Sequence, residues 1–160
     1  MDEKVFIYLR LTMGDTVLAR SKIREFAGLG SLLAQFLHRT LRDGVELPPE
    51  LEAEGGSVPA LDYVDANTGD VLIRFRVDPV ERVQVVEGRI PPPYQGRMLD
   101  PDATAISLSR FQEVAAEEGM NEEQRRVLSD RLAKSQIGVL TQIRETIDEE
   151  GRFRVQVPLP

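Results

Sequence analysis

The sequence predicts an α+β fold, a curled and mostly antiparallel sheet of about four to six strands packed against an amphipathic helix, with a helical second half and a C-terminal strand. Three observations predict it. Runs in which apolar and polar side chains alternate are concentrated before residue 88 and return at the C-terminus. Apolar residues spaced three and four apart occupy 103–150. A proline-rich stretch separates these two halves.

The length fits one domain. A chain of 160 residues is at a common domain size and can bury roughly two-thirds of its unfolded surface without disulfides. We therefore expect a single domain over 1–160. It would contain a strand-rich half (1–88), a proline-rich connection (89–102) and a helical half that ends in a strand (103–160).

Composition excludes several classes of chemistry. The chain has no Cys and one His, which excludes disulfides, thiolate metal sites and multi-histidine metal centres. No apolar run reaches the roughly 20 residues that span a bilayer, and the N-terminus passes directly into a strand-like run. We therefore expect a cytoplasmic protein with no membrane contact. No phosphate-binding glycine loop occurs, so we expect no cofactor.

The first strand and its hairpin come from local patterns. Apolar residues alternate with others from Val5 to Leu11, which is the two-residue period of a strand. Gly14-Asp15 then offers turn chemistry, so Thr16–Arg20 is predicted to return as the second strand of a hairpin.

A helix and an acidic loop follow. Leucines and Phe36 recur at spacings of three and four over 29–41, which predicts an amphipathic helix. The single histidine, His38, falls on the polar side of that helix, and we interpret it as a surface imidazole. Eight acids and no Lys or Arg lie between Asp43 and Ile73, and the part up to Pro59 reads as a solvated loop.

A second hairpin is predicted around the turn Asp65–Asp70. Beyond the turn, Arg74 and Arg76 alternate with apolar residues that we expect to face the core, namely Val71, Ile73, Phe75 and Val77. Val83 and Val85 alternate with Arg82 and Gln84, which predicts another strand.

The turn Asp65–Asp70 also carries oxygen donors. Asp65, Asn67 and Asp70 resemble part of a calcium loop, so they are candidate ligands for a divalent metal. However, the residue at the twelfth position is Arg76, where an EF-hand needs an acid. The alternative is a plain hairpin turn whose Asp and Asn side chains accept backbone hydrogen bonds while Gly69 takes a positive φ.

Three consecutive prolines, Pro91 to Pro93, predict an extended, polyproline-like connection over 89–102. Pro91 to Tyr94 also fits the Pro-Pro-x-Tyr pattern that WW domains bind. The alternative is a stiff linker whose tyrosine packs back on the domain. In either case this segment offers candidate residues for contact with a protein partner, namely Pro92, Tyr94, Arg97 and Met98.

The second half is predicted to be helical. One helix is expected to begin near Ser107 or Ser109 and to stop at Gly119. Asn121 followed by Gln124 resembles a capping box and predicts a new helix. Its apolar stripe runs from Val127 to Ile147, with Gly138 as a possible break between two shorter helices.

The chain is predicted to end in a strand. Phe153, Val155 and Val157 alternate with Arg154 and Gln156 after Gly151, which stands where a helix C-cap belongs.

A basic stretch lies on the predicted second-half helix. Arg125, Arg126, Arg131 and Lys134 could form a nucleic-acid face, but no aromatic residue is interleaved with them. The net charge of −7 also disfavours nucleic acid, because the overall field repels phosphate. We interpret the stretch as a solvated, salt-bridged face.

These patterns favour a non-catalytic protein-interaction module, such as an adaptor, a chaperone-like protein or an assembly subunit of a larger complex. Recognition would use apolar helix faces and sheet edges, and a protein partner or self-association is expected. Two alternatives stay open. One is a small enzyme or ligand-binding domain that uses acids and arginines, with an optional divalent metal near 62–70. The other is nucleic-acid binding through the Arg125–Lys134 face.

Overall fold

The computed structural model describes residues 4–29, 59–78, 80–109 and 121–159. The predicted helix over 29–41 with His38, most of the acidic loop, and the apolar residues of 111–115 therefore lie outside the described residues. The predicted α+β fold is confirmed by the rest of the chain, in which an antiparallel sheet is combined with helices and a C-terminal strand.

The described strands form one seven-stranded sheet in which every strand pair is antiparallel. The order is β2-β1-β4-β5-β6-β7, and the short β3 also pairs with β1. The strands are β1 (Phe6–Met13), β2 (Thr16–Arg20), β3 (Arg24–Glu25), β4 (Pro59–Asp65), β5 (Val71–Asp78), β6 (Val83–Arg89) and β7 (Arg152–Pro158).

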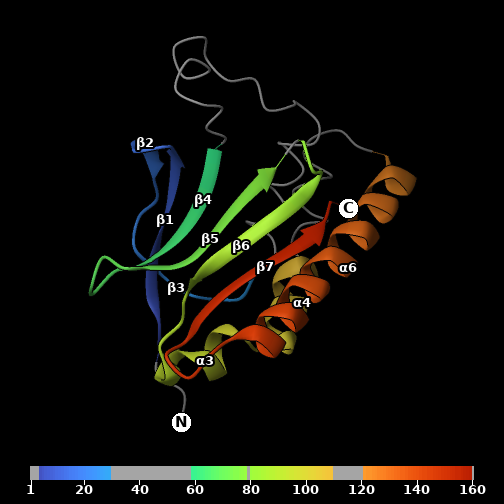
Figure 1. Ribbon diagram of the computed structural model, residues 1–160. Helices are drawn as coiled ribbons and strands as arrows, with labels where there is room; N and C mark the ends of the chain where they lie inside the picture. The colour runs from blue at the N-terminus through green and yellow to red at the C-terminus, as the bar shows by residue number, and fades with distance from the viewer. Residues whose placement is uncertain (1–3, 30–58, 79, 110–120, 160) are drawn as a thin grey trace.

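Three helices follow β6 within the described part of the chain. They are α3 (Pro92–Met98), α4 (Pro101–Ser109) and α6 (Glu122–Thr146). α6 contacts both β7 and α4, and Figure 1 shows it running beside β7, at the opposite end of the sheet from β2. The two outer strands of the sheet therefore have very different surroundings.

The core lies on the sheet face that the helices cover. Alternate residues of each strand point to this face, as the two-residue period requires. Val139, Leu140 and Ile143 of α6 join the same cluster. The sheet contributes buried residues from five strands, including Ile7, Leu9, Tyr63, Ile73, Phe75, Val86 and Val155. The first strand, both predicted hairpins and the last strand are thereby confirmed.

Gln84 lies on the core face of β6. It is opposite Val77 on one side and Val157 on the other, and its side chain is buried. A hydrogen bond to Ser135 of α6 satisfies its amide nitrogen. The strand predicted from the alternation of Val83 and Val85 is therefore confirmed, with the glutamine on its inner face.

The expected extended connection over 89–102 is wrong. Pro91 keeps a polyproline conformation, with φ −54 and ψ 145, but it is the N-cap of α3, and the two prolines after it are the first residues of the helix. Proline is well suited to a first helical turn, because its fixed φ is helical and the N–H that it lacks would have no partner there. α4 then begins at Pro101, earlier than the predicted start near Ser107.

α6 is one continuous helix. Its N-terminus has the predicted capping box between Asn121 and Gln124, and Gly138 does not interrupt it. Val127, which was expected in the apolar stripe, is exposed. The buried side chains of α6 that the structure describes run from Gln136 to Ile143, and three of them belong to the core cluster.

Candidate functional site

A row of alternating charges crosses the sheet face opposite the core. The strand register places Arg10, Asp62, Arg74, Glu87 and Arg154 next to one another on five adjacent strands. Opposite charges at directly opposed positions stabilise a sheet. The row therefore helps to specify the register of β1, β4, β5, β6 and β7.

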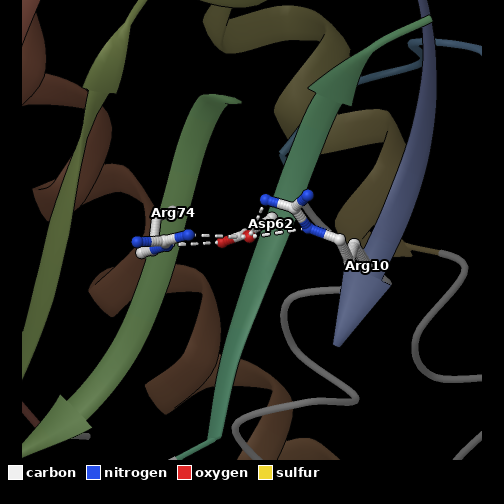
Figure 2. Close-up of polar contacts among 3 residues, drawn as sticks. All are labelled: Arg10, Asp62 and Arg74. Carbon is white, nitrogen blue, oxygen red and sulfur yellow. Dashed lines mark hydrogen bonds and ion pairs between the residues drawn. The ribbon is translucent and has the colours of Figure 1, made fainter. Parts of the chain in front are cut away.

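The centre of this row is Asp62. Its carboxylate accepts hydrogen bonds from Nε and Nη2 of Arg74 at 2.8 and 3.1 Å, and from Nε and Nη2 of Arg10 at 3.2 and 3.0 Å. Figure 2 shows the carboxylate lying between the two guanidinium groups. The Asp62 side chain is fully buried, whereas 19% of Arg10 and 36% of Arg74 remain exposed. The buried charge is therefore compensated from both sides.

This arrangement also acts on Arg74. Its hydrogen bonds to Asp62 raise the pKa of its guanidinium, while partial burial acts in the other direction. Both oxygens of the buried Asp62 carboxylate accept hydrogen bonds from Arg10 and Arg74. We interpret the Arg10–Asp62–Arg74 triad as a structural connection between three strands.

Two adjoining hollows lie at one end of the sheet. A cleft of about 690 Å³ lies where the β4–β5 turn, the β6–α3 connection and the α6–β7 turn meet. A second hollow of about 400 Å³ adjoins it on the β5–β6–β7 face. Both are lined by Val71, Arg89 and Arg152. The cleft is thus built from three connections that are far apart in the sequence.

The candidate metal ligands lie on the β4–β5 side of this cleft. Asp65 and Asp70 line it, but Asp65 is buried and its Oδ1 accepts a hydrogen bond from the Asn67 backbone N–H at 2.8 Å. Gly69 has φ +78 and donates its N–H to the Asp65 carbonyl oxygen. These hydrogen bonds are those expected of a hairpin turn.

Metal binding at this turn stays a prediction. Within 4–29, 59–78, 80–109 and 121–159, no group of three or more His, Cys, Asp or Glu side chains could hold a metal ion. A rise in melting temperature on addition of Ca²⁺ or Mg²⁺ would support a site that includes Asp65, Asn67 and Asp70.

The candidate partner-contact residues are divided between surface and core. Pro92 is exposed on α3, and Tyr94 lines the cleft while packing partly against the core. Arg97 is 3.9 Å from Glu25 of β3, and Met98 is completely buried. The tyrosine packs back on the domain as expected, but from helix α3 and not from a stiff linker. Contact with a partner by these residues stays a prediction.

The described residues of the basic stretch on α6 lie at the protein surface. Arg126, Arg131 and Lys134 are exposed. Lys134 pairs with Asp130 one turn earlier at 3.1 Å, which is the i,i+4 pairing expected of a solvated helix face.

A separate exposed surface is the edge of the sheet at β2. All five residues of Thr16–Arg20 are exposed, including Val17 and Leu18 at 41% and 47%. A bulge in the pairing with β1 leaves Leu18 without a residue opposite to it. Arg20 is the one charged residue of β2, and its guanidinium lies over the ring of Tyr8, 5.8 Å from the centroid.

Sequence reasoning missed the arginines of the cleft and the role of Asp62. Asp62 was one of eight acids in a segment without basic residues, and its partner Arg10 is 52 residues away. The signal that could have identified the role of Asp62 was the alternation of apolar and polar residues along the predicted strands. Arg10 and Arg74 occupy outward positions of predicted strands, and an acid on a strand between them would connect the two.

Comparisons with known proteins identify no relative of this chain, since no family model, no curated protein and no solved structure matches it. No helix in the described part of the chain is long and apolar enough to cross a membrane.

Proposed function

We propose that this chain is a non-catalytic protein-interaction module, such as an adaptor, a chaperone-like protein or an assembly subunit, that binds an extended segment of a protein partner along the β2 edge. The observation that carries the proposal is the exposed and nearly uncharged β2 strand at the end of the sheet. We place the module in a cytoplasm-like compartment.

An edge strand offers unpaired backbone groups to another chain. β2 pairs with β1 on one side, and no described strand pairs with its other side. An extended peptide that adds to such an edge gains main-chain hydrogen bonds, while its side chains select the partner. Val17 and Leu18 supply exposed apolar surface at the same place. Backbone groups and apolar contacts are therefore available together.

The other edge of the sheet provides a comparison. β7 places Arg152, Arg154, Gln156 and Pro158 at its exposed positions, and α6 packs against the strand. Charged side chains, proline and a covering helix are the devices that protect sheet edges from pairing with other chains. On β2 the single charge, Arg20, is turned over the ring of Tyr8. This contrast between the two edges supports β2, and not β7, as the edge to which a strand of the partner is added.

The charge row supports recognition in preference to bond chemistry. Asp62 is completely buried and accepts hydrogen bonds from Arg10 and Arg74. A general base must lie within reach of a substrate proton, and this buried carboxylate is not exposed to one. The ionisable groups that line the cleft are acids, arginines and Tyr94.

The experiment compares edge-blocking substitutions with a matched control. Leu18→Lys and Val17→Lys each place a charge on β2, which opposes strand addition. Val80→Lys makes the same change in the turn between β5 and β6, where the side chain is 89% exposed. Self-association is measured by light scattering coupled to size exclusion, and protein partners by quantitative mass spectrometry after capture.

We expect the oligomer or the captured partner to be lost with both β2 variants and retained with Val80→Lys. Far-UV circular dichroism and a urea transition confirm that each variant is folded. The proposal fails if the wild-type chain is a monomer and no captured protein distinguishes the β2 variants from the control.

A further inference from the structure

Two arginines are directly opposed on the exposed face of the sheet. The β6–β7 register pairs Arg89 with Arg152, and two residues further along, on the same face, it pairs Glu87 with Arg154. The Glu87 and Arg154 side chains approach to 3.6 Å. Like charges at directly opposed positions destabilise a sheet. The Arg89–Arg152 pair therefore differs from the matched pairs Arg74–Glu87 and Glu87–Arg154 beside it, as does the Arg10–Arg20 pair at the other end of the row.

Neighbouring acids neutralise this pair weakly. Arg152 lies 3.3 Å from Glu150, with 69% and 65% of the two side chains exposed, and exposed ion pairs of this kind contribute little. Arg89 is exposed, and it has no ion pair or hydrogen bond from its side chain to the residues that the structure describes. Two guanidinium groups are thus left with unused donors on adjacent strands.

Both arginines line the hollow of about 400 Å³ on this face, together with Arg74, Glu87 and Gly88. Arg74 directs Nε and Nη2 to Asp62, so it adds positive potential from a fixed position. The strands below are held by the sheet and by the ion-pair row. The hollow is consequently lined by two exposed arginines, of which Arg152 has only the solvent-exposed ion pair with Glu150.

We propose that Arg89 and Arg152 form a binding site for a single oxyanion group, either a carboxylate or a phosphate. The planar guanidinium group binds such anions in a bidentate manner. A bound anion would also relieve the repulsion between the two arginines. The net charge of −7 and the acids Asp65 and Asp70 in the adjoining cleft oppose a polyanion such as nucleic acid. The site is independent of strand addition at β2.

The test uses the whole chain and two kinds of probe. Inorganic phosphate is titrated in one arm, and a short peptide with a free C-terminal carboxylate is titrated in the other, with its amidated form as the comparison. Amide chemical shifts and melting temperature are recorded for the wild type, Arg89→Gln and Arg152→Gln. Arg131→Gln removes an equally exposed arginine from α6 and is the control.

We expect saturable changes in the amide chemical shifts of β6 and β7 with at least one probe. Arg89→Gln and Arg152→Gln should each raise the dissociation constant about tenfold or more, whereas Arg131→Gln should leave it unchanged. Tighter binding of phosphate identifies phosphate as the ligand, and a preference for the free peptide over the amidated one identifies a carboxylate. In anion-free buffer, both cleft variants should melt at a higher temperature than the wild type, because the repulsion is removed.

Three results would overturn the proposal. The first is the absence of saturable shifts with both probes. The second is an equal loss of binding in Arg131→Gln, which would indicate general charge attraction. The third is a lower melting temperature of the cleft variants in anion-free buffer, which would assign the arginines a structural role.

Discussion

Replacing Asp62 with alanine removes the carboxylate that joins β1, β4 and β5 on the outer face of the sheet. Four hydrogen bonds are lost, two from Arg10 and two from Arg74. The two guanidinium groups then lie near each other without an anion between them. Both the lost bonds and the remaining repulsion should destabilise the folded state.

The magnitude follows from burial. Removing one partner of a buried ion pair costs about 3–5 kcal/mol, because the remaining charge is left without compensation. Here the buried member is the one removed, and the arginines keep exposed fractions of 19% and 36%, so they can regain water. We therefore expect Asp62→Ala to lower the free energy of unfolding by about 3 kcal/mol. Arg10→Gln leaves Asp62 paired with Arg74 and should cost only about 1 kcal/mol.

Urea denaturation at pH 7, followed by circular dichroism, measures these differences. Glu87→Ala is the control, because Glu87 contacts Arg154 at 3.6 Å in a more exposed pair and should cost less than about 1 kcal/mol. The reasoning is refuted if Asp62→Ala costs no more than Glu87→Ala. A changed denaturant slope would instead indicate that the compactness of the folded or unfolded state has changed, or that the variant no longer unfolds in two states.

Three further predictions concern the core and the turns. The Tyr63 hydroxyl is buried and has no hydrogen-bond partner among the residues that the structure describes, and burial raises the pKa of this phenol above its ordinary 10.0. Both states keep the proton below pH 10, but above it the unfolded chain releases the proton first, so stability should fall by up to about 1.4 kcal/mol per pH unit. Tyr63→Phe should remove this component in denaturation measured from pH 9 to 11, and an unchanged alkaline slope would contradict it. Gln136 is completely buried, and within the described part of the chain neither atom of its amide has a hydrogen-bond partner. Gln136→Leu should therefore raise the free energy of unfolding by about 1 kcal/mol; a loss would show that the amide is satisfied. Gly151 has φ +88 and a Cβ there would lie 2.0 Å from the Ile90 carbonyl oxygen, whereas a Cβ at Gly138 in α6 would meet nothing within 4 Å. Gly151→Ala should therefore lower the free energy of unfolding by about 1 kcal/mol or more, and Gly138→Ala should raise it by up to about 1 kcal/mol; equal changes in the two variants, measured by urea denaturation, would contradict the strain at Gly151.

Local periodicity was sufficient for much of the fold. The alternation in β1, β5 and β7 and the capping box of α6 each depend on a few consecutive residues, and the structure confirms them. The turn at Asp65–Asp70 was likewise predictable, because Asp, Asn and Gly determine a hairpin turn through their own backbone and side chains. These elements are specified by interactions within short segments.

Proline was ambiguous at the same local level. The conformation of Pro91 fits both a polyproline strand and the cap of a helix, and its neighbours are compatible with either continuation. Packing resolves the choice, since α3 buries Met98 and part of Tyr94 against the core. An extended segment would leave the methionine in water.

Local patterns along the chain were enough to predict the α+β class, most strand positions and the turn chemistry, and its composition excludes thiolate and multi-histidine sites. Which residues meet across the sheet could be seen only in the folded protein. Asp62 lies between Arg10 and Arg74, and Arg89 lies opposite Arg152, because the order and register of the strands bring together residues that are far apart in the chain. The same order decided that β2 is an exposed edge while α6 covers β7. Strand order and register depend on burying one face of every strand in a common core, and that is a property of all the strands together.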